Sequence, residues 1–255
     1  MAHDLSSDAA LAVELVEQAG ALAARIRSKG LDVEEKTSGS DVVTQADVAA
    51  ERLIVERLTL ERPDDAIVGE EGTSRPGTSG RTWVIDPVDG TYNFMRGSDW
   101  WCSAIALTGE EDVLLGAVHH PALGETWLGG PDLPSTRNGA RLDPLPDTPA
   151  EARCATTYLH PPFFKDEVGV AFARGLEQVG TLRMLGSGTM DAMAIASGRW
   201  DVLFQHSVED WDRLPGAAII RGAGGTSTQV DAAGVLWTVS GSSRAVEDVA
   251  AALVR

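Results

Sequence analysis

The sequence has little positive charge and little cysteine. It contains 21 Lys and Arg residues against 38 Asp and Glu residues, which gives a formal net charge of −17. Because nucleic-acid backbones bind to basic surfaces, this balance argues against a nucleic-acid-binding protein. The two cysteines, Cys102 and Cys154, lie far apart and are expected to be reduced core thiols, and no Cys/His cluster has the spacing of a zinc site.

Long apolar runs are absent as well. No run approaches the roughly 20 residues of a membrane span. The N-terminus, residues 1–20, is acidic and amphipathic, without the basic and apolar segments of a secretory signal. We therefore expect a cytoplasmic protein without a membrane partner. Apolar residues make up 43% of the 255 residues, which is enough for the core of one large domain or two closely packed halves.

The densest chemical signal lies in the stretch from Trp83 to Phe94. Its apolar start predicts the end of a buried strand, which Asp86-Pro87 should stop because proline has no N–H to donate to a strand ladder. Asp89-Gly90-Thr91 follows at once, so two carboxylates and a hydroxyl share one turn. Two acids this close repel each other unless a cation lies between them, and oxygen ligands suit Mg²⁺ or Mn²⁺. A lone Asp-Pro turn would be interpreted more simply, as a solvated loop.

Other acidic signals accompany this stretch. Glu70-Glu71 follows a short apolar strand at 66–68, and because strands are depleted in Glu, Glu70 is a candidate metal ligand, with a solvated loop as the alternative. Asp47 ends a segment that resembles a capping box, where a helix acid and a site residue are equally good interpretations. The Gly-, Ser- and Pro-rich segment 74–81 predicts a mobile loop that gates access to the site.

A proline-rich segment, residues 142–151, marks the predicted boundary between two halves. Residues 1–145 are expected to form an α+β half with most of the metal ligands, and residues 146–255 an α/β half that completes the site in one compact unit. Apolar periodicity predicts helices over 7–28 (capped by Ser6 or Ser7), 45–60, 163–178, 186–196, 210–221 and 245–253. Strands are predicted over 66–68, 83–85, 100–107, 113–119, 125–128, 152–157, 181–184 and 199–204, with a hairpin over 31–43 around Gly39 and a turn at Asn138-Gly139.

Three segments resemble, in order and residue type, the inositol monophosphatase family of Mg²⁺-dependent, Li⁺-sensitive phosphatases: Gly69-Glu70-Glu71, Asp86–Thr91 and Trp211-Asp212. Further positions fall where that family has functional residues: Lys36, Asp47, Gly186-Ser187-Gly188 and Gly224-Gly225. The resemblance covers about residues 10–250. It implies an α+β or α/β fold, a layered αβαβα sandwich of the inositol monophosphatase/fructose-bisphosphatase type, and a homodimer.

The resemblance also implies roles for individual residues. One Mg²⁺ would be held by Glu70, Asp86 and the main-chain carbonyl of Val88, and a second by Asp86, Asp89 and Asp212. Glu70 would support a third ion through water, and Mn²⁺ is an alternative metal. The substrate would contact Asp89, Gly90, Thr91, Ser187, Gly188, Gln205 and Asp212. The implied catalytic residues are Glu70, Thr91 and Asp47, with Asp47 accepting a hydrogen bond from the Thr91 hydroxyl. Lys36 and Glu71 would lie in the outer site.

Hydrolysis of a phosphate monoester follows from this ligand set, because bound metals neutralise the ester and activate the attacking water. The expected substrate is inositol monophosphate, with histidinol phosphate or another small phosphorylated metabolite as the second choice. Gln205 stands where inositol-specific members have a Glu, so the leaving-group side departs from the inositol pattern. The alternative class is a metal-binding regulator or scaffold without turnover. Four isolated histidines are predicted to be structural: His119, His120, His160 and His206.

Overall fold

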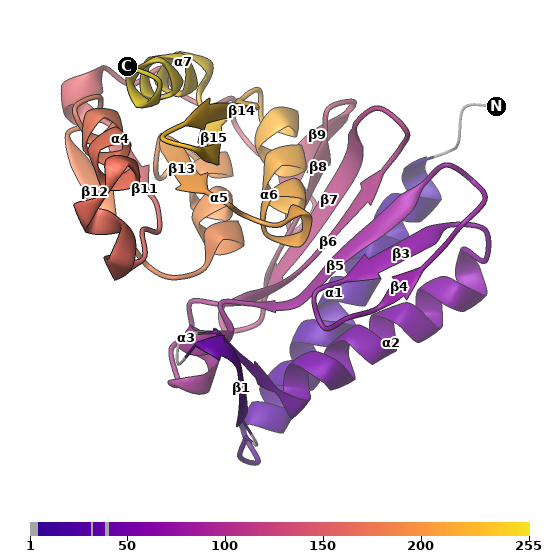
Figure 1. Ribbon diagram of the computed structural model, residues 1–255. Coiled ribbons are helices and arrows are strands. Elements are labelled where there is room, and N and C mark those ends of the chain that lie inside the picture. Colours follow the sequence, from indigo (N-terminus) through magenta and orange to yellow (C-terminus); the bar gives the residue numbers. More distant parts are fainter. Residues whose placement is uncertain (1–4, 32, 39–40) are drawn as a thin grey trace.

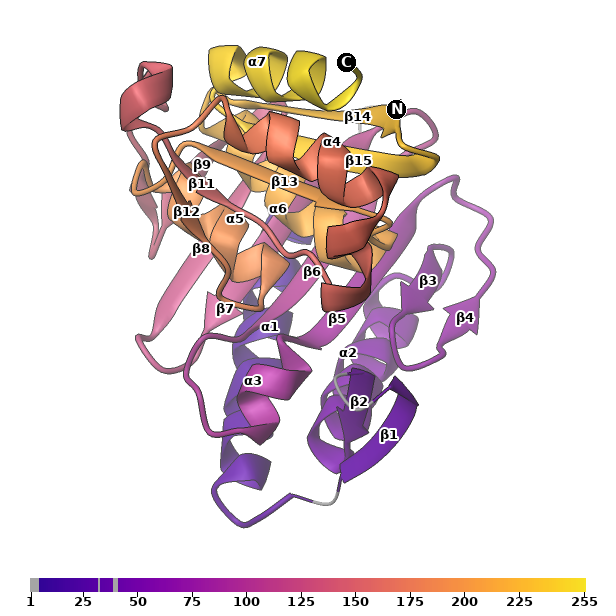
Figure 2. The same cartoon turned by 60° about the vertical axis from the view of Figure 1, so that its left-hand side comes forward.

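The computed structural model describes residues 5–31, 33–38 and 41–255, without the side chains of residues 33–42. Two β-sheets alternate with three layers of helices, in the order helices, large sheet, helices, small sheet, helices (Figure 1). The turned view separates the two sheets and shows the middle helices between them (Figure 2). The predicted αβαβα sandwich is therefore confirmed. Among the described helices, none is both long and apolar enough to cross a membrane.

The first layer of helices covers the outer face of the large sheet (Figure 1). It consists of α1 (Leu5–Arg27) and α2 (Gln45–Glu61), with the antiparallel hairpin of β1 (Val33–Ser38) and β2 (Asp41–Thr44) between them. The hairpin was predicted, but its expected tip at Gly39 lies outside the described residues. Ser6 and Ser7 lie within α1, so the prediction that one of them caps this helix is wrong.

The large sheet has eight strands in the order β10-β9-β8-β7-β6-β5-β3-β4. They are β3 (Ala66–Gly69), β4 (Ser74–Arg75), β5 (Thr82–Asp89), β6 (Cys102–Thr108), β7 (Val113–His120), β8 (Glu125–Gly130), β9 (Leu133–Arg137) and β10 (Ala140–Arg141). β3 and β5 are parallel, and the other neighbours are antiparallel. The predicted turn at Asn138-Gly139 joins β9 to β10, and both residues have the positive φ that a two-residue hairpin requires.

The middle and outer helices enclose the small sheet, whose order is β12-β11-β13-β15-β14. Its strands are β11 (Cys154–Thr156), β12 (Thr181–Arg183), β13 (Val202–His206), β14 (Thr226–Ala232) and β15 (Val235–Gly241). The helices are α5 (Gly188–Ala196) and α6 (Asp210–Gly222) in the middle layer, and α4 (Glu167–Leu176) and α7 (Ser243–Leu253) outside. Short helices are α3 (Thr91–Met95), η1 (Ala150–Ala152) and η2 (Pro161–Lys165).

Two further local predictions are corrected by the structure, and two strands were missed. The helix expected over 163–178 begins at Glu167, because the Asp166 carboxylate accepts hydrogen bonds from the N–H groups of Val168 and Gly169 and caps it there. The strands β14 and β15 were not predicted. The segment 74–81, predicted to be a mobile gate, instead contains β4 at the sheet edge and is tied to the Asp64 carbonyl by two backbone hydrogen bonds.

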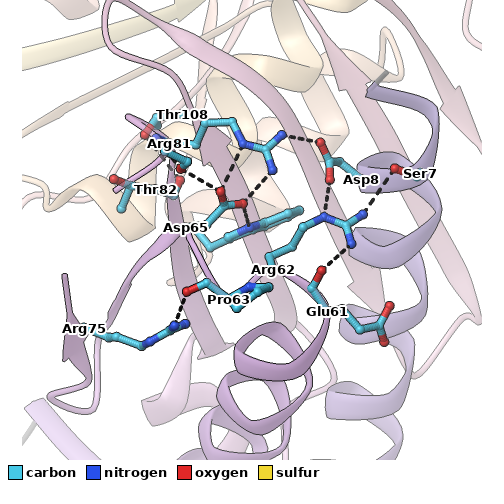
Figure 3. Close-up of polar contacts among 12 residues, drawn as sticks. Ser7, Asp8, Glu61, Arg62, Pro63, Asp65, Arg75, Arg81, Thr82 and Thr108 are labelled. Carbon is cyan, nitrogen blue, oxygen red and sulfur yellow. Dashed lines mark hydrogen bonds and ion pairs between the residues drawn. The ribbon is translucent and has the colours of Figure 1, made fainter. Parts of the chain in front are cut away.

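A buried ion-pair network fastens the first helical layer to the large sheet (Figure 3). The guanidinium of Arg81, the residue directly before β5, contacts Asp65 and, at 2.6 Å, Asp8 of α1. Asp8 also pairs with Arg62, the residue that follows α2, at 2.6 Å. The indole N–H of Trp83 donates to Asp65 at 2.9 Å. Because both carboxylates are 3% exposed, each depends on these donors for compensation of its charge.

Candidate active site

A pocket of about 650 Å³ opens where the carboxyl end of β5 meets the N-termini of α3, α5 and α6. Its lining comes from both sheets and their connections: Glu70, Asp89, Gly90, Thr91, Tyr92, Asn93, Tyr158, His160, Met184, Leu185, Gly186, Ser187, Gly188, Asp191, Gln205 and Asp212. The structure thus brings to one pocket residues from distant parts of the chain, of which Glu70 and Asp212 are the furthest apart in sequence.

Three carboxylates gather beside this pocket. One oxygen each of Asp86, Asp89 and Asp212 lies within 4.8 Å of the others. The first two come from β5, which does not stop at Pro87 as predicted but continues to Asp89 through a bulge opposite β6. The bulge takes Pro87 out of the regular ladder, and the Ser103 hydroxyl donates to its carbonyl at 2.6 Å. The bulge thereby places both β5 acids in the cluster although they are three positions apart.

The charges of this cluster are poorly compensated by the protein itself. Burial, followed by the negative charges of Glu70, Asp89 and Asp212, raises the pKa of Asp86 well above its ordinary value. Burial, followed by the charges of Asp89 and Glu70, raises the pKa of Asp212 to about 8. Such carboxylates ionise readily only beside a cation, and a set of carboxylate oxygens suits a hard divalent ion. The residues present therefore fit a Mg²⁺ or Mn²⁺ site.

Glu70 lies in the turn between β3 and β4, and its N–H donates to the Ile85 carbonyl at 3.1 Å. It lines the pocket, and its charge contributes to the raised pKa of Asp86, so the structure brings this predicted ligand to the cluster. The Val88 carbonyl, also a predicted ligand, accepts a hydrogen bond from the Thr91 hydroxyl at 3.0 Å. The predicted metal set therefore surrounds one end of β5.

Thr91 is held from α2 as the resemblance implied. Its hydroxyl lies 3.2 Å from Oδ1 of Asp47, while Oδ2 of the same carboxylate accepts the Thr44 N–H at 3.1 Å. The Thr44 hydroxyl in turn accepts the Ala46 N–H, which completes the capping box at the start of α2. Asp47 is fully buried, and this burial raises its pKa. The two interpretations of Asp47 therefore both hold, because one oxygen caps α2 and the other contacts Thr91.

The start of α5 is bonded to the acid cluster. Oδ2 of Asp89 accepts hydrogen bonds from the Ser187 hydroxyl and the Thr189 N–H, both at 2.7 Å. The Ser187 oxygen also caps α5 by accepting the Met190 N–H. Its hydroxyl proton is therefore engaged within the protein. Gly188 lies against Gln205, whose Oε1 would be 3.1 Å from a Cβ at that position, so both predicted leaving-group residues lie on one wall.

Some predicted residues are not among the described residues that line the pocket. Glu71 is not part of the pocket lining, and its N–H donates to Glu51 of α2. Lys36 lies on β1, and its side chain is outside the described part of the chain. Gly224-Gly225 ends α6 away from the pocket, where Gly224 takes a positive φ and a Cβ at Gly225 would lie 2.6 Å from the Gly241 carbonyl oxygen. This glycine pair serves chain packing.

Sequence reasoning missed an aromatic wall of the pocket. His160, predicted to be only structural, lines the pocket with Tyr158, and their rings meet edge to face with centroids 4.6 Å apart. Tyr92 and Asn93 belong to the central motif but were given no role, and the Asn93 amide donates to the Leu185 carbonyl at 2.7 Å. No local pattern marks Tyr158 or His160, because only the packing of the two sheets brings them to the site.

Asp191 on the pocket wall offers a test of pH dependence. Its carboxylate accepts hydrogen bonds from Thr156 and from the Trp100 indole, yet burial raises its pKa to about 7. Because the pKa of Asp191 is raised in the folded state, ionisation of Asp191 lowers the stability of the fold. This loss of stability is absent below about pH 4 and complete above about pH 7. Asn can accept from the indole and donate to the Thr156 oxygen. We expect Asp191→Asn to raise the unfolding free energy at pH 8 by about 2–4 kcal/mol.

Denaturant unfolding of the metal-free protein at pH 8 and pH 4.5 measures this effect. The gain should shrink at the lower pH, whereas the exposed Asp143→Asn should change neither value. Equal stability of Asp191→Asn and the unsubstituted protein at pH 8 would contradict the assignment.

Comparison with known proteins agrees with the fold. A layered sandwich with a buried carboxylate cluster at its pocket indicates the class of metal-dependent phosphatases. The model of the inositol monophosphatase family matches residues 4–253, and the chain belongs to this family of phosphatases. The family resemblance of the sequence is thereby confirmed.

Curated relatives carry different substrate names. A fructose-1,6-bisphosphatase/inositol-1-monophosphatase of Thermotoga maritima is 33% identical over 77% of this chain and 75% of its own length. An inositol-1-monophosphatase of Rhizobium meliloti is 32% identical over 87% of this chain and 85% of its own. A histidinol-phosphatase of Chlorobaculum parvum is 32% identical, with the same two coverages. These relatives support a phosphatase without selecting its alcohol.

Solved structures share the whole fold. The extragenic suppressor protein suhB of Bartonella henselae aligns with a TM-score of 0.87 at 24% identity, over 97% of this chain and 98% of that one. The IMPase of Thermotoga maritima aligns with a TM-score of 0.80 at 30% identity, over 93% and 94%.

Proposed function

We propose that the protein is a Mg²⁺-dependent phosphomonoesterase for a small phosphorylated alcohol, with inositol monophosphate as the first candidate. The observation that carries this proposal is the buried cluster of Asp86, Asp89 and Asp212, which adjoins Glu70 and the Thr91–Asp47 pair. A scaffold without turnover would need the acids but has no use for a hydroxyl held in this way.

Two or three metal ions would be held by Glu70, Asp86, the Val88 carbonyl, Asp89 and Asp212. When bound, they would neutralise the ester, lower the pKa of water and stabilise the leaving alkoxide. The carboxylate donor set suits Mg²⁺, and Mn²⁺ shares its preference for oxygen.

Thr91 and Glu70 would orient the attacking water. The Thr91 hydroxyl has one proton and two acceptors within reach, Asp47 Oδ1 at 3.2 Å and the Val88 carbonyl at 3.0 Å. Once that proton is donated, the Thr91 oxygen is left to accept a hydrogen bond from the water. Glu70 lines the same pocket and supplies a second acceptor.

The phosphate would lie against Gly90 and Thr91. Gly90 has φ of +90°, and a Cβ there would come within 3.1 Å of both Ser187 Cβ and the Trp100 carbonyl oxygen. Its backbone leads into α3, whose first N–H groups point away from the helix and suit an anion.

Water is the expected nucleophile, because no thiol is available for covalent catalysis. Cys102 is fully buried, and burial followed by the charges of Asp89 and Asp86 raises its pKa well above the ordinary value. Cys154 lies on β11 and is absent from the pocket lining.

The pocket favours one phosphate over two. Within the described part of the chain, its charged lining is acidic and includes no Lys or Arg. Among these described lining residues, a second phosphate group would find no counter-charge beyond the metals, which favours a monophosphate. Gln205 is neutral and can bind hydroxyl groups of the leaving alcohol as donor or acceptor.

Histidinol phosphate is the second candidate. The edge-to-face pair of Tyr158 and His160 on the pocket wall, with Asp191 on the same pocket, suits an alcohol that carries a planar ring and a positive charge. The histidinol-phosphatase among the relatives is consistent with this choice.

Phosphate release from a small panel tests the proposal. The panel contains inositol 1-phosphate, histidinol phosphate, glycerol 2-phosphate and adenosine 3′,5′-bisphosphate, each with Mg²⁺ or with EDTA. We expect release from a monophosphate only with Mg²⁺, inhibition by Li⁺, and the slowest release from the bisphosphate. Absence of release from every ester would favour a metal-binding regulator.

The proposal includes the dimeric assembly implied by the family resemblance and the location expected from the sequence. We expect a cytoplasmic homodimer in which residues 1–145 and 146–255 fold as one unit. Light scattering after size-exclusion chromatography measures the mass, and a monomer would contradict the expected dimer.

A further inference from the structure

Two buried acids lie one turn apart on the sheet-facing side of α2. Asp47 is fully buried and Glu51 is 4% exposed. Like charges at this spacing repel each other on a helix, so each carboxylate requires a compensating set of donors. Asp47 receives donors from the cap of α2 and from Thr91, and Glu51 receives a different set.

Glu51 accepts three hydrogen bonds from the turn between β3 and β4. Its Oε2 accepts the Glu71 N–H at 2.8 Å. Its Oε1 accepts the Thr73 N–H at 3.2 Å and the Thr73 hydroxyl at 2.6 Å. Both oxygens therefore face donors, a requirement that a carboxylate meets and that a carboxamide, with one donor end, does not.

The turn closes over this carboxylate because of Gly69. A Cβ at Gly69 would lie 2.3 Å from Oε2 of Glu51, so any side chain there would displace the acid. Glu70 lies between Gly69 and Glu71, with its own N–H bonded to the Ile85 carbonyl. Glu51 thus fixes the backbone on the C-terminal side of Glu70, and the Ile85 carbonyl of β5 fixes the N–H of Glu70 itself.

We propose that Glu51 is a positioning residue that sets the metal affinity of the active site by holding the turn that carries Glu70. This inference rests on the metal site of the proposed function. Partners that orient metal ligands typically contribute about 10–100-fold in metal affinity or activity. A residue that only stabilised the fold would instead change the melting temperature and leave the metal affinity of the folded protein unchanged.

The variant Glu51→Gln tests the inference. It keeps the shape of the side chain, but its NH₂ group would face an N–H or O–H donor of the turn in place of a carboxylate oxygen. Mn²⁺ and Mg²⁺ dissociation constants are measured by titration calorimetry well below the melting temperature, and the metal-dependent rise in melting temperature gives a second reading. We expect metal binding about 10–100-fold weaker, with phosphate release restored to within a few-fold at saturating metal. The control Glu56→Gln changes an exposed acid of the same helix that pairs with Arg52, and it should bind metal like the unsubstituted protein.

Thr73→Val provides a milder test if Glu51→Gln fails to fold. It removes only the hydroxyl donor and should weaken metal binding in the same direction by a smaller factor. Unchanged dissociation constants in folded Glu51→Gln, or in Thr73→Val, would overturn the inference, as would a failure of the unsubstituted protein to bind either metal. If the unsubstituted protein binds metal but releases no phosphate, the proposed function fails while the role of Glu51 is still decided by calorimetry.

Discussion

Asp86→Asn is expected to abolish phosphate release while leaving the chain folded. Asp86 is the acid whose pKa is raised by burial and then by three neighbouring carboxylates, and it would be shared between the proposed metals. Loss of about 4 kcal/mol of metal-dependent transition-state stabilisation corresponds to a roughly thousand-fold fall in turnover. The amide oxygen of Asn can still accept the Val88 N–H that Asp86 accepts at 3.0 Å, so the bulge should persist.

The same substitution distinguishes a loss of catalysis from a loss of folding. An acid whose folded pKa is raised destabilises the metal-free fold when it ionises, so Asp86→Asn should melt no lower than the unsubstituted protein at pH 8 without metal. The exposed Asp143→Asn serves as the control for both assays. Turnover like that of the unsubstituted protein in Asp86→Asn, at saturating Mg²⁺, would refute the assignment of this site.

Arg81→Met is expected to cause the largest loss of stability. It removes the guanidinium that contacts both Asp65 and Asp8, and it leaves two carboxylates of 3% exposure close together (Figure 3). Breaking a buried ion pair from one side typically costs about 3–5 kcal/mol. Arg62 still pairs with Asp8, so Asp65 would be the acid left most poorly compensated.

Denaturant unfolding at pH 7 measures this loss. The control Arg52→Met breaks an exposed pair with Glu56 on α2 and should leave the unfolding midpoint unchanged. Folded Arg81→Met should retain phosphate release at low temperature, because the network lies outside the pocket lining. A midpoint equal to that of the unsubstituted protein would show that the network does not hold the first helical layer.

The elements that could be predicted are those with a strong local signal. The capping box at Thr44–Asp47 fixes the start of α2, and Asn138-Gly139 fixes a hairpin. β14 lacks such a signal, whereas β15 begins with a Val-Leu-Trp-Thr-Val run whose β-branched and aromatic residues are typical of a strand. β14 is a polar Thr-Ser-Thr-Gln run with partly exposed side chains, and the turn to β15 uses Ala233-Gly234, in which Ala233 adopts φ of +54° that its residue type does not favour.

The site residues also divide into those that the sequence could predict and those that it could not. Glu70, Asp86 and Asp89 are recognisable because acids are unusual at strand ends, and Asp212 is recognisable through the family resemblance. The structure brings the four together. Pro87 misled the prediction because a bulge, which depends on β6, lets the strand continue past a residue that cannot pair. Tyr158, His160 and Glu51 depend wholly on tertiary contacts, so no pattern in their neighbourhoods identifies them.

The bond from Asp89 to the start of α5 has a consequence for how the protein is made. Three of the acids are synthesised early. Ser187 and Thr189, which bind Asp89 at the start of α5, lie 98 and 100 residues after it, and α6 with Asp212 follows later still. A chain interrupted between the two sheets holds mutually repelling acids with no fourth member to share a cation. A divalent ion held by all four acids would therefore favour the finished chain, and its binding energy would be added to the folding of both sheets at once.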